Sequence, residues 1–278
     1  MKHTRRKALK SLKILYLAVH LLLMVFPLYW ILITSFKPRG DIFKLPITYW
    51  PATFSLDNYK NIFTVSKFHI YIGNSLLVSI LSAFFVICIA ILSGYAMARF
   101  KFRGHKQIML AFFLTQMLPS FMSLAPLYMM MSKLGLTNTR LSLIIMYTTM
   151  NIAFSTIMLR GFFQRIPTSI EEAAMIDGCS RVSSLLRIII PVMLPGISST
   201  FIFAFVQNWN ELFYAVMFID SNWLKTLPVG MNSFVLKFDI DWGSMSAGTV
   251  ISVLPTVLMF AFAQRYIVEG LTQGAEKG

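Results

Sequence analysis

The chain has 278 residues, of which 56% are hydrophobic and only 13% are charged, and its formal net charge is +14. A soluble domain carries about 25% charged residues, so this composition excludes an ordinary soluble protein and indicates one that meets lipid over much of its surface. The basic residues gather in short segments between long apolar stretches, which is typical of membrane proteins and argues against a nucleic-acid-binding protein.

Six apolar stretches are each long enough for a helix that crosses the membrane, which needs about 20 residues. The first follows a basic tail and has an apolar core too long for a signal peptide, with no small-residue cleavage site after it, so we expect a retained helix. The sequence therefore predicts an all-α membrane protein with six transmembrane helices near Ile14–Phe36, Tyr71–Ala98, Gln107–Met131, Leu141–Gly161, Ile188–Phe218 and Met245–Val268.

The connecting segments predict the orientation of these helices. With the N-terminus inside, 16 of the 25 Lys and Arg residues lie on the cytoplasmic side, which favours cytoplasmic N- and C-termini. We expect one transmembrane domain over residues 1–278. Its parts outside the membrane are a basic cytoplasmic tail at 1–13, an outer segment at 37–70 whose prolines preclude a long helix, a cytoplasmic loop at 162–187, an outer loop at 219–244 and a cytoplasmic tail at 269–278.

The cytoplasmic loop between the fourth and fifth helices has the pattern of two short helices joined by a tight turn. Ser169 and Glu172 have the spacing of a capping box, which predicts a helix that begins there. Gly178 suits the left-handed conformation that ends such a helix, and Ser180 can cap a second short helix that continues through Arg187.

This helix-turn-helix has two interpretations. Ala173 and Ala174 would let another protein approach the first helix closely, so the loop could be a docking element. It could equally be an ordinary helix that lies at the membrane surface. The sequence contains no G-x-x-x-x-G-K-[ST] motif, so if ATP drives this protein, we expect another chain to bind it.

The loop also carries a resemblance to a known family. Glu172-Ala173-Ala174, Gly178 and Ile188 through Pro191 resemble the signature E-A-A-x3-G-x9-I-x-L-P of permeases from binding-protein-dependent ABC importers, with Ile190 in place of the usual Leu. The resemblance points to the carbohydrate-uptake branch and its maltose-type second permease. It extends over most of the chain through Gly73–Leu76, Gly94–Phe100, Pro126–Tyr128, Leu134–Thr139, Trp209–Glu211, Thr226–Gly230 and Gln264–Leu271.

The resemblance implies a type I importer permease in a bacterial or archaeal inner membrane. Its partners would be a sister permease, two ATPase subunits and an extracytoplasmic solute-binding protein, and the chain itself would be no enzyme and would hold no cofactor or metal. The transported solute would be a sugar or oligosaccharide, although a polyol, a sugar phosphate or another solute stays open. The residues expected to couple the permease to its ATPase are Glu172, Ala173, Ala174, Asp177 and Gly178.

Polar residues within the predicted spans are candidates for the translocation path. On a continuous fifth helix, Gln207, Asn210, Glu211 and Tyr214 would share one face, at offsets of three, four and seven residues. A carboxylate at that depth needs a cavity or a partner, so we expect Glu211 to point inward. Asn74 is a further candidate. For all five residues, hydrogen bonding between helices is the alternative role.

The alternative functions are a secondary transporter and an intramembrane enzyme, and the outer loop is a further candidate surface. A secondary transporter usually shows internal repeats and embedded titratable residues, and this sequence offers only Glu211. An intramembrane enzyme would need a nucleophile, base or metal set, and the four histidines are scattered. The outer loop with Trp223, Asp239, Asp241 and Trp242 is either a docking surface for a binding protein or an ordinary interfacial loop.

Overall fold

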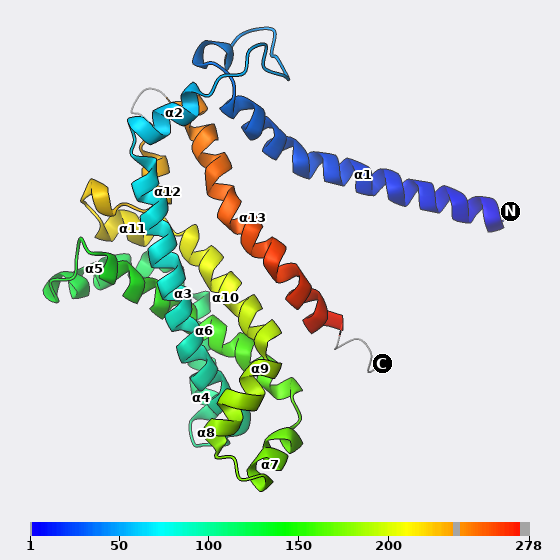
Figure 1. Ribbon diagram of the computed structural model, residues 1–278, viewed down its shortest axis with the longest axis vertical. Helices are drawn as coiled ribbons and strands as arrows, with labels where there is room; N and C mark the ends of the chain where they lie inside the picture. The colour runs from blue at the N-terminus through cyan, green and yellow to red at the C-terminus, as the bar shows by residue number, and fades with distance from the viewer. Residues whose placement is uncertain (1, 236–239, 273–278) are drawn as a thin grey trace. The chain divides into compact units, whose positions relative to one another are not determined.

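The computed structural model describes residues 2–235 and 240–272, and within these ranges the chain forms helices and loops with one isolated bridge between Val235 and Ile240. The predicted all-α class is confirmed (Figure 1). The helices are α1 Lys2–Ser35, α2 Asp57–Thr64, α3 Phe68–Arg99, α4 His105–Met117, α5 Leu124–Lys133, α6 Arg140–Arg165, α7 Thr168–Ile176, α8 Arg181–Ser184, α9 Ile190–Val192, α10 Leu194–Trp209, α11 Phe213–Phe218, α12 Leu227–Asn232 and α13 Trp242–Thr272.

Four of the described helices are long and apolar enough to cross a membrane by themselves, over Lys10–Ser35, Phe68–Arg99, Arg140–Arg165 and Trp242–Phe262. Two bent pairs pass the same test together. His105–Met117 and Phe121–Lys133 meet at 95°, and Arg181–Val192 and Leu194–Trp209 meet at 78°. The chain has six spans if each pair crosses as one unit. The predicted third and fifth spans therefore each correspond to a bent pair of helices.

Proline accounts for both bends. Pro119 disfavours helical geometry in the residue before it, and Leu118 is accordingly extended, with φ −79° and ψ 126°, directly after α4. Pro195 has no N–H to donate to the preceding turn, and Met193, just before α10, has φ −86° and ψ 0°.

The chain folds as two compact units, Met1–Phe68 with Met231–Leu254 and His69–Gly230 with Pro255–Gly278. The single domain that we expect over residues 1–278 stays a prediction. Each of the two units has buried polar contacts of its own.

In the first unit, buried polar groups hold the segment that follows α1. Asn58 Nδ2 donates to the carbonyl oxygens of Ser35 and Lys37, at 3.0 and 2.9 Å. The Lys37 side chain is only 1% exposed. Its Nζ donates to the Thr48 carbonyl at 2.5 Å and lies 4.6 Å from the centroid of the Trp30 ring. These contacts satisfy buried groups that would otherwise be costly, so they order a loop region with little regular structure.

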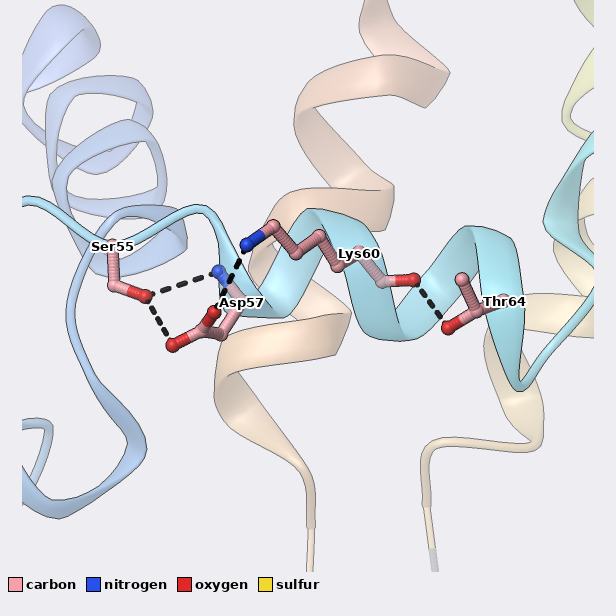
Figure 2. A network of polar contacts seen from close by, with 4 residues as sticks. All are labelled: Ser55, Asp57, Lys60 and Thr64. Atoms are coloured by element: carbon pink, nitrogen blue, oxygen red, sulfur yellow. Dashed lines mark hydrogen bonds and ion pairs between the residues drawn. The ribbon is translucent and has the colours of Figure 1, made fainter.

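The short helix α2 in the same unit is stabilised locally at both ends (Figure 2). Ser55 Oγ accepts from the Asp57 backbone N–H at 3.0 Å and donates to Asp57 Oδ2 at 2.7 Å. Thr64 Oγ1 donates to the Lys60 carbonyl at 2.7 Å at the other end. The Lys60–Asp57 ion pair at 3.8 Å is exposed and contributes little. As predicted, the segment 37–70 contains no long helix before α3 begins.

In the second unit, α3 packs closely against α6 at Gly94. A Cβ atom on Gly94 would lie 3.1 Å from the Arg160 backbone nitrogen and 3.2 Å from Leu159 Cβ. A buried apolar cluster surrounds this crossing and consists of Ala90, Tyr95, Leu159, Phe163, Leu185, Ile189 and Met193. The absence of a side chain at residue 94 therefore sets the distance between the two helices.

We expect Gly94→Leu to destabilise the protein by about 1–3 kcal/mol, because the added side chain meets helix backbone that cannot move aside. Gly73→Leu is the matched control, since both residues lie in α3 and nothing lies within 4 Å of a Cβ at residue 73. Both variants gain the same helix propensity. The measurement is thermal unfolding of the purified chain in detergent, and equal midpoints for the two variants would contradict the expectation.

Candidate functional site

The α7–α8 loop, residues 168–184, is the predicted helix-turn-helix. Helix α7 begins at Thr168 directly after Pro167, and no side chain caps its N-terminus. The capping box predicted for Ser169 and Glu172 is therefore wrong. Proline fixes φ near −65°, and here Pro167 has φ −58°, which sets the chain for the start of the helix without a side-chain cap.

The predictions for the turn and the second helix are confirmed. Helix α7 ends at Ile176, and Gly178 adopts a left-handed conformation with φ +87°. Ser180 Oγ then accepts from the Ser183 backbone N–H at 3.2 Å and caps α8. A π-helical turn, Leu185–Ile189, continues from α8 to α9.

A buried ionic network joins α7 to the end of α3. Glu171 Oε1 lies 2.7 Å from Arg99 Nε, and Glu171 Oε2 accepts from the Tyr95 hydroxyl at 2.8 Å. Arg99 Nη2 also donates to the Ile166 carbonyl at 2.9 Å. The Arg99 and Glu171 side chains are only 7% and 9% exposed. The carboxylate and the guanidinium are thus paired and hydrogen-bonded, as buried charges must be.

Sequence reasoning missed this network because it favoured Glu172, the first residue of the Glu-Ala-Ala triplet. Glu171 and Ala174 lie three residues apart on one face of α7, and both are buried. The expectation that the Ala174 side chain meets another protein is therefore corrected, since it packs within this chain.

The opposite face of α7 is exposed. It carries Glu172 and Ala173 from the predicted set, together with Ile176, whose side chain is 86% exposed. Asp177 and Gly178, in the turn that follows α7, are exposed as well. A large apolar side chain so exposed at the end of a helix is available for contact with another protein.

A second candidate site is a cavity of about 340 Å³ within the second unit. Its polar residues come from α4, α6, α10 and the segment after α10. The lining comprises Gln116, Tyr147, Met150, Asn151, Phe154, Phe203, Gln207, Asn208, Asn210, Glu211, Leu212 and Phe213. Three of the predicted path residues, Gln207, Asn210 and Glu211, are therefore brought together here.

These three residues do not share the face of one continuous helix, as the sequence predicted. Helix α10 ends at Trp209, and α11 begins only at Phe213. The Glu211 carboxylate accepts from the backbone N–H groups of Tyr214 at 3.0 Å and Ala215 at 3.2 Å. It therefore caps α11, and this local hydrogen bonding competes with continuation of α10.

Tyr214 and Asn74, the other two predicted path residues, do not line this cavity. Tyr214 is 1% exposed, and its hydroxyl lies 2.8 Å from the Ser123 hydroxyl. Asn74 Nδ2 donates to the carbonyl oxygens of Trp223 and Lys225, at 2.8 and 2.9 Å. Its Oδ1 accepts from Arg140 Nε at 2.9 Å. Asn74 thus makes the contacts between segments that were its alternative role.

The lining of the cavity combines stacked aromatic rings with amide side chains. The Phe154 and Phe203 rings stack with centroids 4.3 Å apart and an angle of 26° between planes. Asn151 Nδ2 donates to Asn208 Oδ1 at 2.9 Å, and Asn208 is buried. Gln207 is exposed at the surface of the chain. A flat apolar wall beside amide groups suits a solute with both apolar faces and hydroxyl groups.

Residues 88–273 match the family model for the binding-protein-dependent transport system inner membrane component. The chain belongs to this family. The matched segment contains both the α7–α8 loop and all the residues that line the cavity, so both candidate sites lie in the family's shared part.

Individual relatives of this importer permease agree with the assignment. The diacetylchitobiose uptake system permease protein DasC of Streptomyces coelicolor is 34% identical over 92% of each chain. The trehalose/maltose transport system permease protein MalG of Thermococcus litoralis is 32% identical over 99% of each chain. The resemblance to maltose-type permeases is confirmed.

The fold is shared with a solved transporter. A chain of a bacterial ABC transporter involved in the import of the acidic polysaccharide alginate superposes with a TM-score of 0.83 at 18% identity, over 94% of this chain and 97% of that one. The type I importer permease fold is therefore confirmed. Its family and its several long apolar helices show that this permease is a multi-pass membrane protein.

We expect Glu171→Ala to destabilise the permease by about 3–5 kcal/mol, because it leaves the buried Arg99 guanidinium without its partner. Tyr95→Phe removes only one hydrogen bond to the carboxylate and should cost about 1.5–3 kcal/mol. Glu172→Ala, on the exposed face of the same helix, is the control and should leave stability unchanged. Chemical unfolding in detergent measures all three, and a Glu171→Ala variant as stable as Glu172→Ala would refute the role of the network.

Proposed function

We propose that this permease and a sister permease form the path through which a sugar or oligosaccharide is imported. An extracytoplasmic binding protein delivers the solute, and ATPase subunits drive the permease through the α7–α8 loop, so that ATP hydrolysis takes place on the partner. The single observation that carries this proposal is the exposed face of α7, mounted on the buried contact between Glu171 and Arg99.

The network supports a mechanical role for the loop. A partner that grips the exposed face of α7 and displaces it must either break the buried ion pair or move the end of α3 with it. Breaking the pair is costly, so the displacement passes to α3. Ala173 and Ile176 offer an apolar contact, and Glu172 and Asp177 supply negative charge beside it. We infer that the ATPase surface opposite is an apolar cleft with a basic rim.

The orientation that fits this proposal has the α7–α8 loop and both termini in the cytoplasm, where ATP is available. The distribution of Lys and Arg supports that orientation. An ion-driven transporter gains little support, because the Glu211 carboxylate is occupied by two backbone N–H groups that it caps.

The cavity supports a sugar as the solute. The aromatic wall at Phe154 and Phe203 can face the apolar side of a pyranose ring, while Gln207 and Asn210 can hydrogen-bond to hydroxyl groups. The lining of the cavity contains no Lys, Arg or His, so it favours a neutral sugar or polyol over a sugar phosphate. DasC and MalG are named for the uptake of diacetylchitobiose and of trehalose or maltose, which agrees with such a solute.

The proposed docking surface for the binding protein is the outer loop, residues 219–244. The Trp223 side chain there is 65% exposed. Asp241 Oδ1 accepts from the Ser244 backbone N–H at 3.1 Å and so helps to begin α13. Asp239, which also belongs to this expectation, lies outside the described residues.

Two variants with one introduced cysteine each test the docking of α7. In a background with Cys88→Ser and Cys179→Ser, we expect Ala173→Cys to form a thiol crosslink to an ATPase subunit in membranes. Ala174→Cys is the matched control, since residue 174 is buried and should not react. Crosslinked species are detected by gel mobility and mass spectrometry. If neither Ala173→Cys nor Ile176→Cys forms a crosslink in a complex that still imports solute, the docking proposal is wrong.

A single substitution tests the cavity. We expect Gln207→Ala to raise the solute concentration for half-maximal uptake about threefold to tenfold, since one hydrogen bond to the solute contributes about 0.5–1.5 kcal/mol. Gln264→Ala, an exposed residue outside the cavity, should leave uptake unchanged. The measurement is uptake of the solute bound by the partner binding protein, with membrane insertion checked by immunoblot. Unchanged uptake by Gln207→Ala would exclude this cavity from the path.

A further inference from the structure

A larger cavity, of about 620 Å³, lies in the second unit where α3 ends, α4 begins and α6 ends. Its size is within the range of small-molecule sites, about 300–1,000 Å³. It is separate from the solute cavity, and the two share no lining residue. Neither the importer activity nor the coupling role assigns it a ligand.

The charged side chains that line this cavity are all basic. Lys101, Lys106 and Arg160 line it together with His105, and no Asp or Glu is among the residues of its wall. Arg160 Nε donates to the Met97 carbonyl at 3.3 Å, which holds that guanidinium at the wall. The neighbouring Arg99, by contrast, is neutralised by Glu171.

The backbone adds to the positive field. Gly104 takes a left-handed conformation with φ +96°, and it turns the chain so that the N-terminus of α4 lies at the cavity. The N-terminus of a helix carries a partial positive charge and unsatisfied N–H groups, both of which favour an anion.

The remainder of the wall is apolar. Phe100 and Phe102 are 41% and 40% exposed, and both contribute to the lining. The cavity lies at the ends of two helices that are long enough to span a membrane, α3 and α6. Spanning helices end where lipid headgroups meet the hydrocarbon, so we expect the cavity at that level. The wall therefore combines cations for a phosphate with aromatic surface for the apolar part of the same ligand.

We propose that this cavity binds the phosphate group of an anionic phospholipid in the cytoplasmic leaflet. The choice of leaflet rests on the orientation in the proposed function. An excess of Lys and Arg on the cytoplasmic side would account for the charge alone, but not for its gathering around one open hollow with an aromatic wall. Basic pockets at this level bind phosphate headgroups in other membrane proteins, with about 1 kcal/mol for each Lys or Arg. A soluble phosphate ester shares the same chemistry and is the alternative source.

The test measures the thermal unfolding of the full-length chain in mild detergent as dioleoylphosphatidylglycerol is titrated in. We expect the midpoint to rise, and dioleoylphosphatidylcholine to have much less effect. The double variant Lys101→Gln with Lys106→Gln should need at least about tenfold more phosphatidylglycerol for the same shift. The control is Lys133→Gln with Lys225→Gln, which removes the same charge from the same unit outside the cavity and should respond as the natural chain does.

Three results would overturn the proposal. The midpoint could fail to respond to phosphatidylglycerol, or the two double variants could lose the response equally, which would indicate unspecific charge attraction. Alternatively, glycerol 3-phosphate alone could shift the midpoint as far as phosphatidylglycerol does, which would make the ligand a soluble phosphate ester. The measurement needs neither ATPase nor solute, so its failure would leave the transport proposal standing, and loss of crosslinking at residue 173 would leave the lipid result standing.

Discussion

The contact between Glu171, Arg99 and Tyr95 is the constraint on which the functional part of this permease depends. A buried ion pair contributes little net stability, because removing two charges from water offsets most of their attraction. Its loss is nevertheless costly, since either partner alone is an uncompensated buried charge. The pair therefore holds α7 firmly to the end of α3, so that the α7–α8 loop and α3 are expected to move together.

Helix α3 is held by polar contacts at both of its ends. Near its start, Asn74 joins it to the segment at Trp223 and Lys225 and to Arg140, and near its finish Arg99 joins it to α7. Its 32 residues span about 48 Å at a rise of about 1.5 Å per residue. Between these ends, Gly94 permits close contact with α6. A displacement of the loop can thus reach the opposite end of the second unit through one stiff element.

The interruption between α10 and α11 lies at the wall of the candidate cavity. Irregular backbone at membrane depth is tolerated where it is buried in protein or lines a cavity, because its N–H and C=O groups still need partners. Residues 210–212, between α10 and α11, meet this condition at the candidate cavity, where the Glu211 carboxylate accepts from the N–H groups of Tyr214 and Ala215 in the first turn of α11. The break that sequence reasoning did not predict therefore places Asn210 and Glu211 at the wall of the cavity.

The features that depend on local chemistry could be predicted from the amino-acid sequence. The apolar lengths gave the spanning helices, Gly178 gave the left-handed turn and Ser180 gave the cap of α8, since each depends on one residue and its neighbours along the chain. The family signature was also readable, because its spacing lies within one short segment. Tertiary structure alone decided that Glu171, and not Glu172, turns inward, because its partners Tyr95 and Arg99 lie more than seventy positions away. The two bends have a local cause in Pro119 and Pro195, but tertiary structure also decided that Asn74 packs between segments and does not line the candidate cavity, since its partners lie far away along the chain.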